Sequence, residues 1–225
     1  MAQPIIICES KVWDKHCVNN LKESLNRPVV HITDNFKFKL DEIRRINPEY
    51  IFFPHWSYII PKEIFSNYQC IVFHMTDLPY GRGGSPLQNL ILAGKKKTKI
   101  SAIDVVEEID AGDIFLKKDL ILSAHAQDIF NKANKIIQEM IIEIVTHSPT
   151  PIPQDGTPTY FKRRQPNESN ISQLDNLDLL YDYIRMLDAE GYPLAYMESD
   201  SLKFEFQNVS KIDNALTASV RITKK

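Results

Sequence analysis

Residues 70–86 read CIVFHMTDLPYGRGGSP, and this stretch joins a short apolar run to a polar loop rich in glycine. Four apolar residues in a row, Cys70–Phe73, are typical of a strand that is buried on both faces of a parallel sheet. The chain has only seven glycines, and five of them lie between Gly81 and Gly112. Because glycine is used where a chain turns sharply or approaches something closely, this region is the first candidate for a functional site.

The same apolar runs recur upstream, separated by segments with helical spacing. Strands are expected at Ile5–Cys8, Pro28–Ile32, Tyr50–Phe53 (ended by Pro54) and Cys70–Phe73, and helices at Val12–Leu25, Leu40–Ile46 and, as a single turn, Pro61–Phe65. Strands that alternate with helical crossovers pair in parallel. The sequence therefore predicts an α/β fold, with a Rossmann-like, mostly parallel sheet and helices on both faces.

Downstream of the loop, a helix is expected after Ser85, a good N-cap, with Pro86 in its first turn and Gly94 just past its end. Strands follow at Thr98–Val106 and Ile114–Leu122. The segment Ala126–Thr146 carries one apolar stripe at helical spacing and is expected to be a core helix.

The composition changes after His147, where the proline-rich segment 148–153 predicts an extended connector. We expect a catalytic domain over residues 1–150 and a small C-terminal subdomain over 151–225, with a helix at Leu177–Asp188. Strands at Leu202–Phe206 and Ala215–Ile222 would form a β-hairpin with one apolar and one polar face. Its own catalytic domain or a second copy could cover the apolar face, and a homodimer is predicted.

Composition and charge narrow the class of protein. With 43% apolar and 25% charged residues the chain is not disordered, and its net charge of −2 argues against a general nucleic-acid binder. No apolar run reaches the roughly 20 residues of a membrane helix, and the N-terminus lacks the pattern of a signal peptide. The three cysteines show no spacing typical of a disulfide framework or a zinc site, so we expect no metal and a cytoplasmic location.

Two loops carry the residue types that chemistry needs, and both are expected beyond the carboxyl ends of strands, where open sheets bind ligands. One begins at His74 and the other contains Asp110. A carboxylate that orients an imidazole is the usual arrangement for proton transfer near neutral pH. The alternative is that both are ordinary surface residues.

These motifs resemble the core of the folate-dependent formyltransferases. The stretches HMTDLPYGRGGSPLQNLILAG (74–94), TKISAI (98–103) and EEIDAGDI (107–114) follow the family pattern N-x-H-x-S-x-L-P-x-x-R-G-x-x-P, then G-x-T, then D-x-G. Tyr58–Lys62 resembles the family's G-x-I-L-P loop. Segments 153–156, 160–164 and 183–185 resemble the sugar N-formyltransferase branch, and the likeness is greatest to the formyltransferase of the pseudaminic acid pathway.

The resemblance implies formyl transfer from 10-formyltetrahydrofolate to a primary amine, with His74 and Asp110 as catalytic residues. The family has an asparagine two residues before the histidine, where this chain has Val72. That asparagine would stabilise the oxyanion, a role typically worth about 3–4 kcal/mol of barrier. Either another donor replaces it, with His74 itself, His55, Ser57 and Thr76 as the candidates, or the activity is reduced or altered.

The resemblance also implies where the folate binds. The pteridine would lie between the loop 58–60 and the backbone of 106–109, against aliphatic walls with a few backbone donors and acceptors. The residues concerned are Tyr58, Ile59, Ile60, Val106, Glu107, Glu108 and Ile109. Plain core packing is the alternative for the first three.

Substrate-binding residues are expected beside the histidine and in the basic patch after the connector. They are Thr76, Tyr80, Arg82, Gly83, Lys162 and Arg163. Arg82 could meet a phosphate or sugar, or it could shape its loop. Lys162 and Arg163 could hold a pyrophosphate, although basic runs are usually solvated.

The most plausible substrate is a nucleotide-linked amino-deoxy sugar, of the UDP-linked 4-amino-4,6-dideoxy type. The turn after the first strand lacks the glycine-rich phosphate loop of a glycinamide ribonucleotide enzyme. The segment after the connector is shorter and less basic than expected for an enzyme acting on methionyl-tRNA, so no nucleic-acid partner is predicted. Two alternatives stay open: a hydrolase that releases formate from the folate, and a catalytically silent folate- or nucleotide-binding module.

Overall fold

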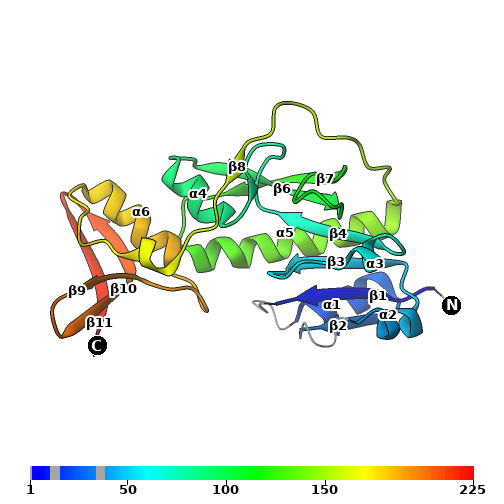
Figure 1. Ribbon diagram of the computed structural model, residues 1–225, viewed down its shortest axis with the longest axis horizontal. Coiled ribbons are helices and arrows are strands. Elements are labelled where there is room, and N and C mark those ends of the chain that lie inside the picture. The colour runs from blue at the N-terminus through cyan, green and yellow to red at the C-terminus, as the bar shows by residue number, and fades with distance from the viewer. Residues whose placement is uncertain (1, 11–15, 34–38) are drawn as a thin grey trace. The chain divides into compact units, whose positions relative to one another are not determined.

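The computed structural model describes residues 2–10, 16–33 and 39–225, and the chain forms two units (Figure 1). The first unit comprises the chain up to Gly83, Lys99–Leu120 and Asn131–Tyr160, and the second comprises Gly84–Thr98, Ile121–Phe130 and Phe161–Lys225. The predicted domain division at residue 150 stays a prediction.

A six-stranded sheet forms the centre of the first unit. Its order is β2 (Val29–Ile32), β1 (Ile5–Glu9), β3 (Tyr50–His55), β4 (Gln69–His74), β6 (Lys97–Asp104) and β7 (Ile114–Ile121). The first four strands pair in parallel, and β6 runs antiparallel to β4. β1 is buried along its whole length, as its continuous apolar run predicts. The mostly parallel α/β fold is therefore confirmed.

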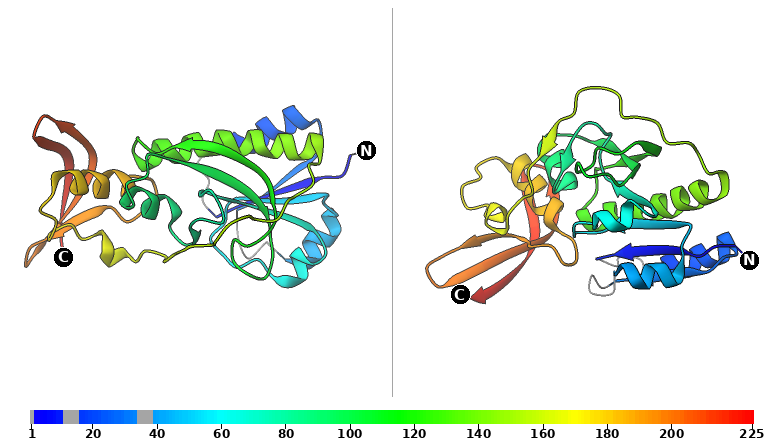
Figure 2. Two further views of the ribbon diagram at one scale, coloured as in Figure 1. Left: turned by 90° about the horizontal axis from the view of Figure 1, so that it is seen from above. Right: turned by 45° about the vertical axis from the view of Figure 1, so that its right-hand side comes forward.

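Helices cover both faces of this sheet, as predicted (Figure 2, left). On one face lie α1 (Cys17–Leu25) and the long α5 (Ala126–His147), joined by a hydrogen bond from Asn20 Nδ2 to Gln138 Oε1 of 3.3 Å. On the other lie α2 (Leu40–Ile46) and α3 (Lys62–Phe65), whose buried Ile43 and Ile64 share one core cluster. The helix predicted to begin at Val12 begins, among the described residues, at Cys17; residues 11–15 lie outside them.

β3 corrects one expectation, because it continues through Pro54 to His55. Between Ile7 and Glu9 the pairing with β1 shifts by one residue, since their partners are Phe52 and His55. A proline has no N–H to give to a sheet and is tolerated at such a bulge. This irregularity is not visible in the apolar pattern.

The second unit contains α4 (Pro86–Leu92), a short 3₁₀ helix (Pro166–Ser169), α6 (Leu177–Leu187) and an antiparallel sheet in the order β11 (Ala215–Lys224), β10 (Leu202–Ile212), β9 (Ala195–Glu198). The predicted hairpin is confirmed, with Phe204 opposite Ile222 and Phe206 opposite Val220. The sequence did not predict β9.

Two short strands, β5 (Arg82–Gly83) and β8 (Tyr160–Phe161), pair with each other.

Ser85 precedes α4 as predicted, but it does not cap the helix. Its backbone is left-handed, with φ at 51°, and its hydroxyl accepts a hydrogen bond of 3.0 Å from the backbone N–H of Arg164 instead. Gly94 follows the helix with φ at 71°, as the expected stop signal requires. Among the described residues, no helix combines the length and apolar character of a membrane span.

Candidate functional site

His74 is the last residue of β4, and its side chain is buried, with 8% of the residue exposed. Its Nε2 lies 2.8 Å from the carbonyl oxygen of Gly81, and its Nδ1 lies 3.5 Å from Oδ2 of Asp110. Both ring nitrogens therefore face oxygen atoms. This geometry suits an imidazole that donates a proton on each side, which is the form a histidine reaches after it has taken up a proton.

The path of the chain that brings Asp110 to His74 differs from the predicted one, in which both residues follow the carboxyl ends of adjacent strands. Because β6 is antiparallel to β4, Ser101 lies opposite His74 while Asp104, the end of β6, lies opposite Ile71. Three residues of strand are roughly 10 Å, so the loop after β6 must return that distance. The predicted meeting of two adjacent carboxyl ends is thus wrong, although the two residues do meet.

The loop that returns Asp110 to His74 is tightly constrained. Asp110 has a left-handed backbone, with φ at 54°, and its Oδ2 accepts a 2.8 Å hydrogen bond from the N–H of Gly83. At Gly112 a β-carbon would lie 1.9 Å from the carbonyl oxygen of Asp104, so only glycine fits. The carboxylate of Asp110 is thereby held between β5 and the imidazole.

Arg82 is buried, and three of its donors bind neighbouring side chains. Its Nη1 donates to Glu108 Oε1 at 2.8 Å, and its Nε and Nη2 donate to Gln154 Oε1 at 3.2 and 2.9 Å. The hydroxyl of Tyr160 also donates to Glu108 Oε1, at 3.1 Å. Of the two readings of Arg82 open from the sequence, this structure favours the loop-shaping one.

Thr76 and Tyr80 differ in what they can offer to a substrate. Thr76 is fully buried, and its hydroxyl has no hydrogen-bond partner among the described residues. Its position inside the protein does not fit the predicted substrate contact. Tyr80 is half-buried in the loop after β4, and its backbone N–H donates to the carbonyl of Asp77 at 3.1 Å.

The two predicted folate walls expose their apolar side chains. Tyr58 is 51% exposed and Ile59 89%, and on the other segment Val106 and Ile109 are 42% and 68% exposed. Plain core packing therefore does not account for Tyr58 or Ile59, whereas Ile60 does pack against the core. Exposed apolar residues on two neighbouring loops are typical of a ligand-binding surface.

An ion pair joins these two segments, since Lys62 Nζ lies 2.7 Å from Glu107 Oε2. The hydrogen bond raises the pKa of Lys62 and lowers the pKa of Glu107. Both groups are mostly solvent-exposed, so the pair contributes little to stability. It does place the loop 58–62 beside the loop 105–109, as the predicted folate cleft requires.

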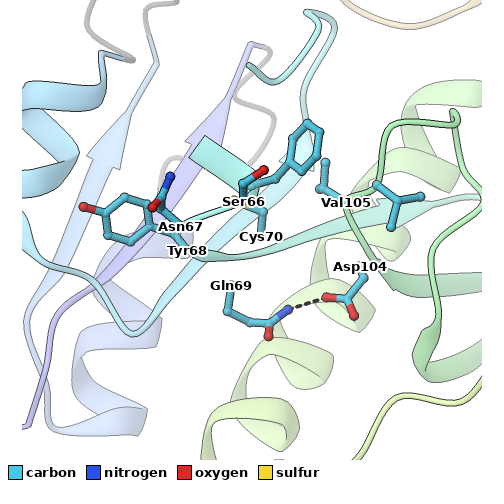
Figure 3. A pocket seen from close by; sticks show the side chains of 9 residues that line it. Ser66, Asn67, Tyr68, Gln69, Cys70, Asp104 and Val105 are labelled. Atoms are coloured by element: carbon cyan, nitrogen blue, oxygen red, sulfur yellow. Dashed lines mark hydrogen bonds between the residues drawn. The ribbon is translucent and has the colours of Figure 1, made fainter. Parts of the chain in front are cut away.

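A pocket of about 360 Å³ opens next to the second of these segments (Figure 3). Of the predicted folate residues it includes only Val106. Gln69 donates a hydrogen bond to Asp104 within it, and burial raises the pKa of Asp104. This pocket could not be predicted from the sequence, because its lining combines the end of α3, the turn after it and the ends of two strands. The lining residues are Phe65, Ser66, Asn67, Tyr68, Gln69, Cys70, Asp104, Val105 and Val106.

Lys162 and Arg163 belong to the second unit, where their backbone is fixed and their side chains are exposed. Asn89 Nδ2 donates to the carbonyl oxygens of Gly84 and Lys162 at 3.0 and 3.1 Å. At Gly84 a β-carbon would lie 2.5 Å from the β-carbon of Arg163, so the two segments touch backbone to backbone. The basic patch is therefore a fixed feature of that unit.

Sequence reasoning did not assign a role to Gln154 and Tyr160, although both lie in segments that carried the resemblance. No group of three histidine, cysteine, aspartate or glutamate side chains among the described residues could hold a metal ion.

The molecule is thus an α/β protein in which a buried histidine and a partly exposed carboxylate, His74 and Asp110, lie next to loops with exposed apolar side chains. A family model described as formyl transferase matches residues 31–145, and one described as the C-terminal domain of methionyl-tRNA formyltransferase matches residues 166–223. The chain belongs to the formyl transferase family.

Some of the similar proteins are named for methionyl-tRNA and others for a sugar. Methionyl-tRNA formyltransferase of Thermodesulfovibrio yellowstonii is 28% identical over 171 residues, which are 72% of this chain and 54% of that protein. The chain thus spans about half the length of the curated relatives it matches.

Among solved structures, one titled methionyl-tRNA formyltransferase from Clostridium thermocellum is 48% identical, with a TM-score of 0.96 and all of both chains covered. A sugar N-formyltransferase from Shewanella sp. FDAARGOS_354 has a TM-score of 0.72 over 93% of this chain and 98% of that one. Its 16% identity shows a shared fold only.

Proposed function

We propose that this chain is a folate-dependent N-formyltransferase that moves the formyl group of 10-formyltetrahydrofolate to the primary amine of a nucleotide-linked amino-deoxy sugar. The observation that carries the reaction class is the geometry around His74: Asp110 at 3.5 Å on one side and the Gly81 carbonyl at 2.8 Å on the other. Membership of the formyl transferase family supports the same class.

The proposed reaction needs one proton to move. The amine nitrogen attacks the formyl carbon, and a nitrogen–carbon bond forms as the carbonyl oxygen becomes an oxyanion. The bond from that carbon to N10 of the folate then breaks, and the proton lost by the amine ends on N10. A histidine that accepts the first proton and returns it serves both steps, and Asp110 stabilises the imidazolium between them.

The oxyanion needs a donor that Val72 cannot supply. Val72 is half-buried, and it packs against the core cluster that contains Ile43 and against the cluster formed by Leu78, Ile103 and Ile114. Of the alternatives, His55 is bonded to Asn134, Ser57 accepts a 3.0 Å hydrogen bond from Ser10, and Thr76 is fully buried. We propose that His74, once protonated, also donates to the oxyanion, with Nε2 exchanging its contact with the Gly81 carbonyl for the oxyanion while Nδ1 faces Asp110.

Charge in the C-terminal region favours a nucleotide-linked sugar over tRNA. Residues 161–225 hold nine lysines and arginines and ten aspartates and glutamates, a net charge of −1. Five of the nine are in ion pairs, namely Arg185, Lys203, Lys211, Arg221 and Lys225. The adjacent and exposed Lys162 and Arg163 suit one pyrophosphate, whereas tRNA binding calls for many phosphate contacts.

Methionyl-tRNA is the second candidate substrate, because the names of the curated relatives and of the 48% identical structure favour it. The hydrolase and the silent binding module remain alternatives from other classes. The four candidates predict different outcomes: an N-formylated sugar, formylated methionyl-tRNA, free formate, or folate binding without any product.

The test is to incubate the chain with 10-formyltetrahydrofolate and a UDP-linked 4-amino-4,6-dideoxy sugar, and to follow the sugar by mass spectrometry. An N-formylated sugar formed together with tetrahydrofolate supports the proposal. Formylated methionyl-tRNA in a parallel reaction without sugar formylation would replace it with the tRNA enzyme. Formate released without any amine indicates the hydrolase, and folate binding without turnover indicates the silent module.

A further inference from the structure

Gln154 makes four side-chain hydrogen bonds around the loop that carries Asp110. Its Nε2 donates to the carbonyl oxygens of Asp110 and Gly112 at 2.8 and 2.9 Å. Its Oε1 accepts from Nε and Nη2 of Arg82 at 3.2 and 2.9 Å. Both ends of the amide are thus used, one on the loop and one on β5.

The part of the loop that Gln154 holds is a strained turn. Asp110 has φ at 54°, a left-handed conformation that is uncommon for residues other than glycine, although asparagine and aspartate adopt it more often than most. Such a conformation persists only where the surroundings hold it in place. The carboxylate accepts from the Gly83 N–H, and the carbonyl of the same residue accepts from Gln154, so the turn is fixed from both sides.

We infer that Gln154 is a positioning residue: it fixes the turn Asp110–Gly112 so that the Asp110 carboxylate faces His74. An amide is the group this place requires, because one end must donate to two carbonyl oxygens and the other must accept from a guanidinium. The inference deepens the proposed function, since it concerns the same His74–Asp110 pair.

A double-mutant cycle tests whether Gln154 acts through Asp110. Gln154→Ala should lower kcat about tenfold while the KM values for folate and amine change less than about twofold. In an Asp110→Asn background the same substitution should cost less than about twofold, because the carboxylate it positions is already gone. An equal loss in both backgrounds would overturn the inference.

Hydrogen exchange of the intact protein supplies a readout that needs no activity. In Gln154→Ala the amide of Gly83, which donates to Asp110 at 2.8 Å, should exchange about tenfold faster. The amide of Val105, which donates to the Cys70 carbonyl at 3.0 Å, should be unchanged. A Gly83 amide that keeps its protection would refute the inference, even if the chain formylated no amine and the proposed function had failed.

Two further variants separate positioning from general stability. Gln154→Glu keeps an acceptor for Arg82 but loses the donors to the turn, so it should behave like the alanine variant; wild-type kcat in Gln154→Glu would contradict the inference. Gln88→Ala is the matched control, because Gln88 is a buried glutamine of the second unit that donates to the Met186 carbonyl at 3.2 Å. It should lower stability without changing the Gly83 amide.

Discussion

Asp110 holds its carboxylate against His74 from a left-handed backbone, and the two side chains are the proposed centre of the reaction. His74→Asn and Asp110→Asn should each lower turnover by about 100-fold, within the range expected for proton-transfer groups. Folate affinity, measured by fluorescence titration, should change much less. Near-normal turnover in either folded variant would remove that residue from the mechanism.

Val72 stands where the family has an asparagine, and its neighbours in the core are Leu78, Ile103 and Ile114. Val72→Asn puts an amide among these side chains, so the free energy of unfolding should fall by about 1–3 kcal/mol. Turnover should not rise if His74 already serves the oxyanion. A rate increase of about tenfold, or 1.4 kcal/mol of barrier, would contradict the proposal of a replacement donor.

Gly112 lies against the backbone of Asp104, with no room for a β-carbon. Gly112→Ala should therefore destabilise the protein by about 1–3 kcal/mol and lower turnover, because the loop that carries Asp110 must shift. Gly94→Ala is the control, since Gly94 has φ at 71° and nothing within 4 Å of a β-carbon. The control should lower the melting temperature through backbone strain and leave turnover unchanged. If both variants lowered turnover equally, Gly112 would have no specific effect on the position of Asp110.

At the scale of the element, the strands β10 and β11 are tied together by one buried carboxylate. Glu205 Oε1 accepts from Lys203 Nζ at 2.9 Å, and Oε2 accepts from Arg221 Nη2 at 2.6 Å. These hydrogen bonds lower the pKa of Glu205 below its ordinary value of 4.5. A lowered pKa in the folded state stabilises the protein above pH 4.5, and this stabilisation is lost as the pH falls through the folded-state value.

Glu205→Gln should consequently be less stable than the wild type near pH 7, and the difference should shrink as the pH falls below about 4. Urea unfolding at a series of pH values measures this difference. A gap that stays constant with pH would show that the ionisation of Glu205 contributes nothing to the hairpin.

The sequence predicted the elements whose apolar residues repeat with the spacing of a strand or a helix over a matching length, as in β1, β4 and α5. It did not predict elements that form only because a neighbouring strand pairs with them. β9 has four residues, AYME, and is a strand because β10 offers it an edge. The antiparallel direction of β6 likewise cannot be predicted from the residues of that strand. It decides how Asp110 reaches His74, so the pair was predictable from its motifs while its geometry was not.

The predicted role of Arg82 shows the same limit. A positive side chain between glycines suggests an anion site, but its partners Glu108 and Gln154 lie 26 and 72 residues away in the chain. Nothing in the local pattern indicates such partners. Gln154 lies 44 residues from Asp110 in the chain, so its contact with that turn could not be predicted from the local sequence either.

At the scale of the whole molecule, the apolar face of the C-terminal sheet is still predicted to pair with a second copy. Met197, Val220 and Ile222 are 40%, 47% and 58% exposed on this face. Ile222→Lys should convert a dimer into a 26 kDa monomer in light scattering, whereas Ser219→Lys, on the other face of the same strand, should not. A wild-type mass near 26 kDa at micromolar concentration would rule out the dimer.

The molecule that receives the formyl group distinguishes the proposed function from its alternatives. A single reaction would contain 10-formyltetrahydrofolate labelled in the formyl carbon, a UDP-linked 4-amino-4,6-dideoxy sugar and methionyl-tRNA at equal concentrations. The proposed function predicts that the label appears in the nucleotide sugar, and that His74→Asn and Asp110→Asn each lower the rate of its transfer by about 100-fold. Label recovered in the tRNA or as free formate, with none in the sugar, would contradict it.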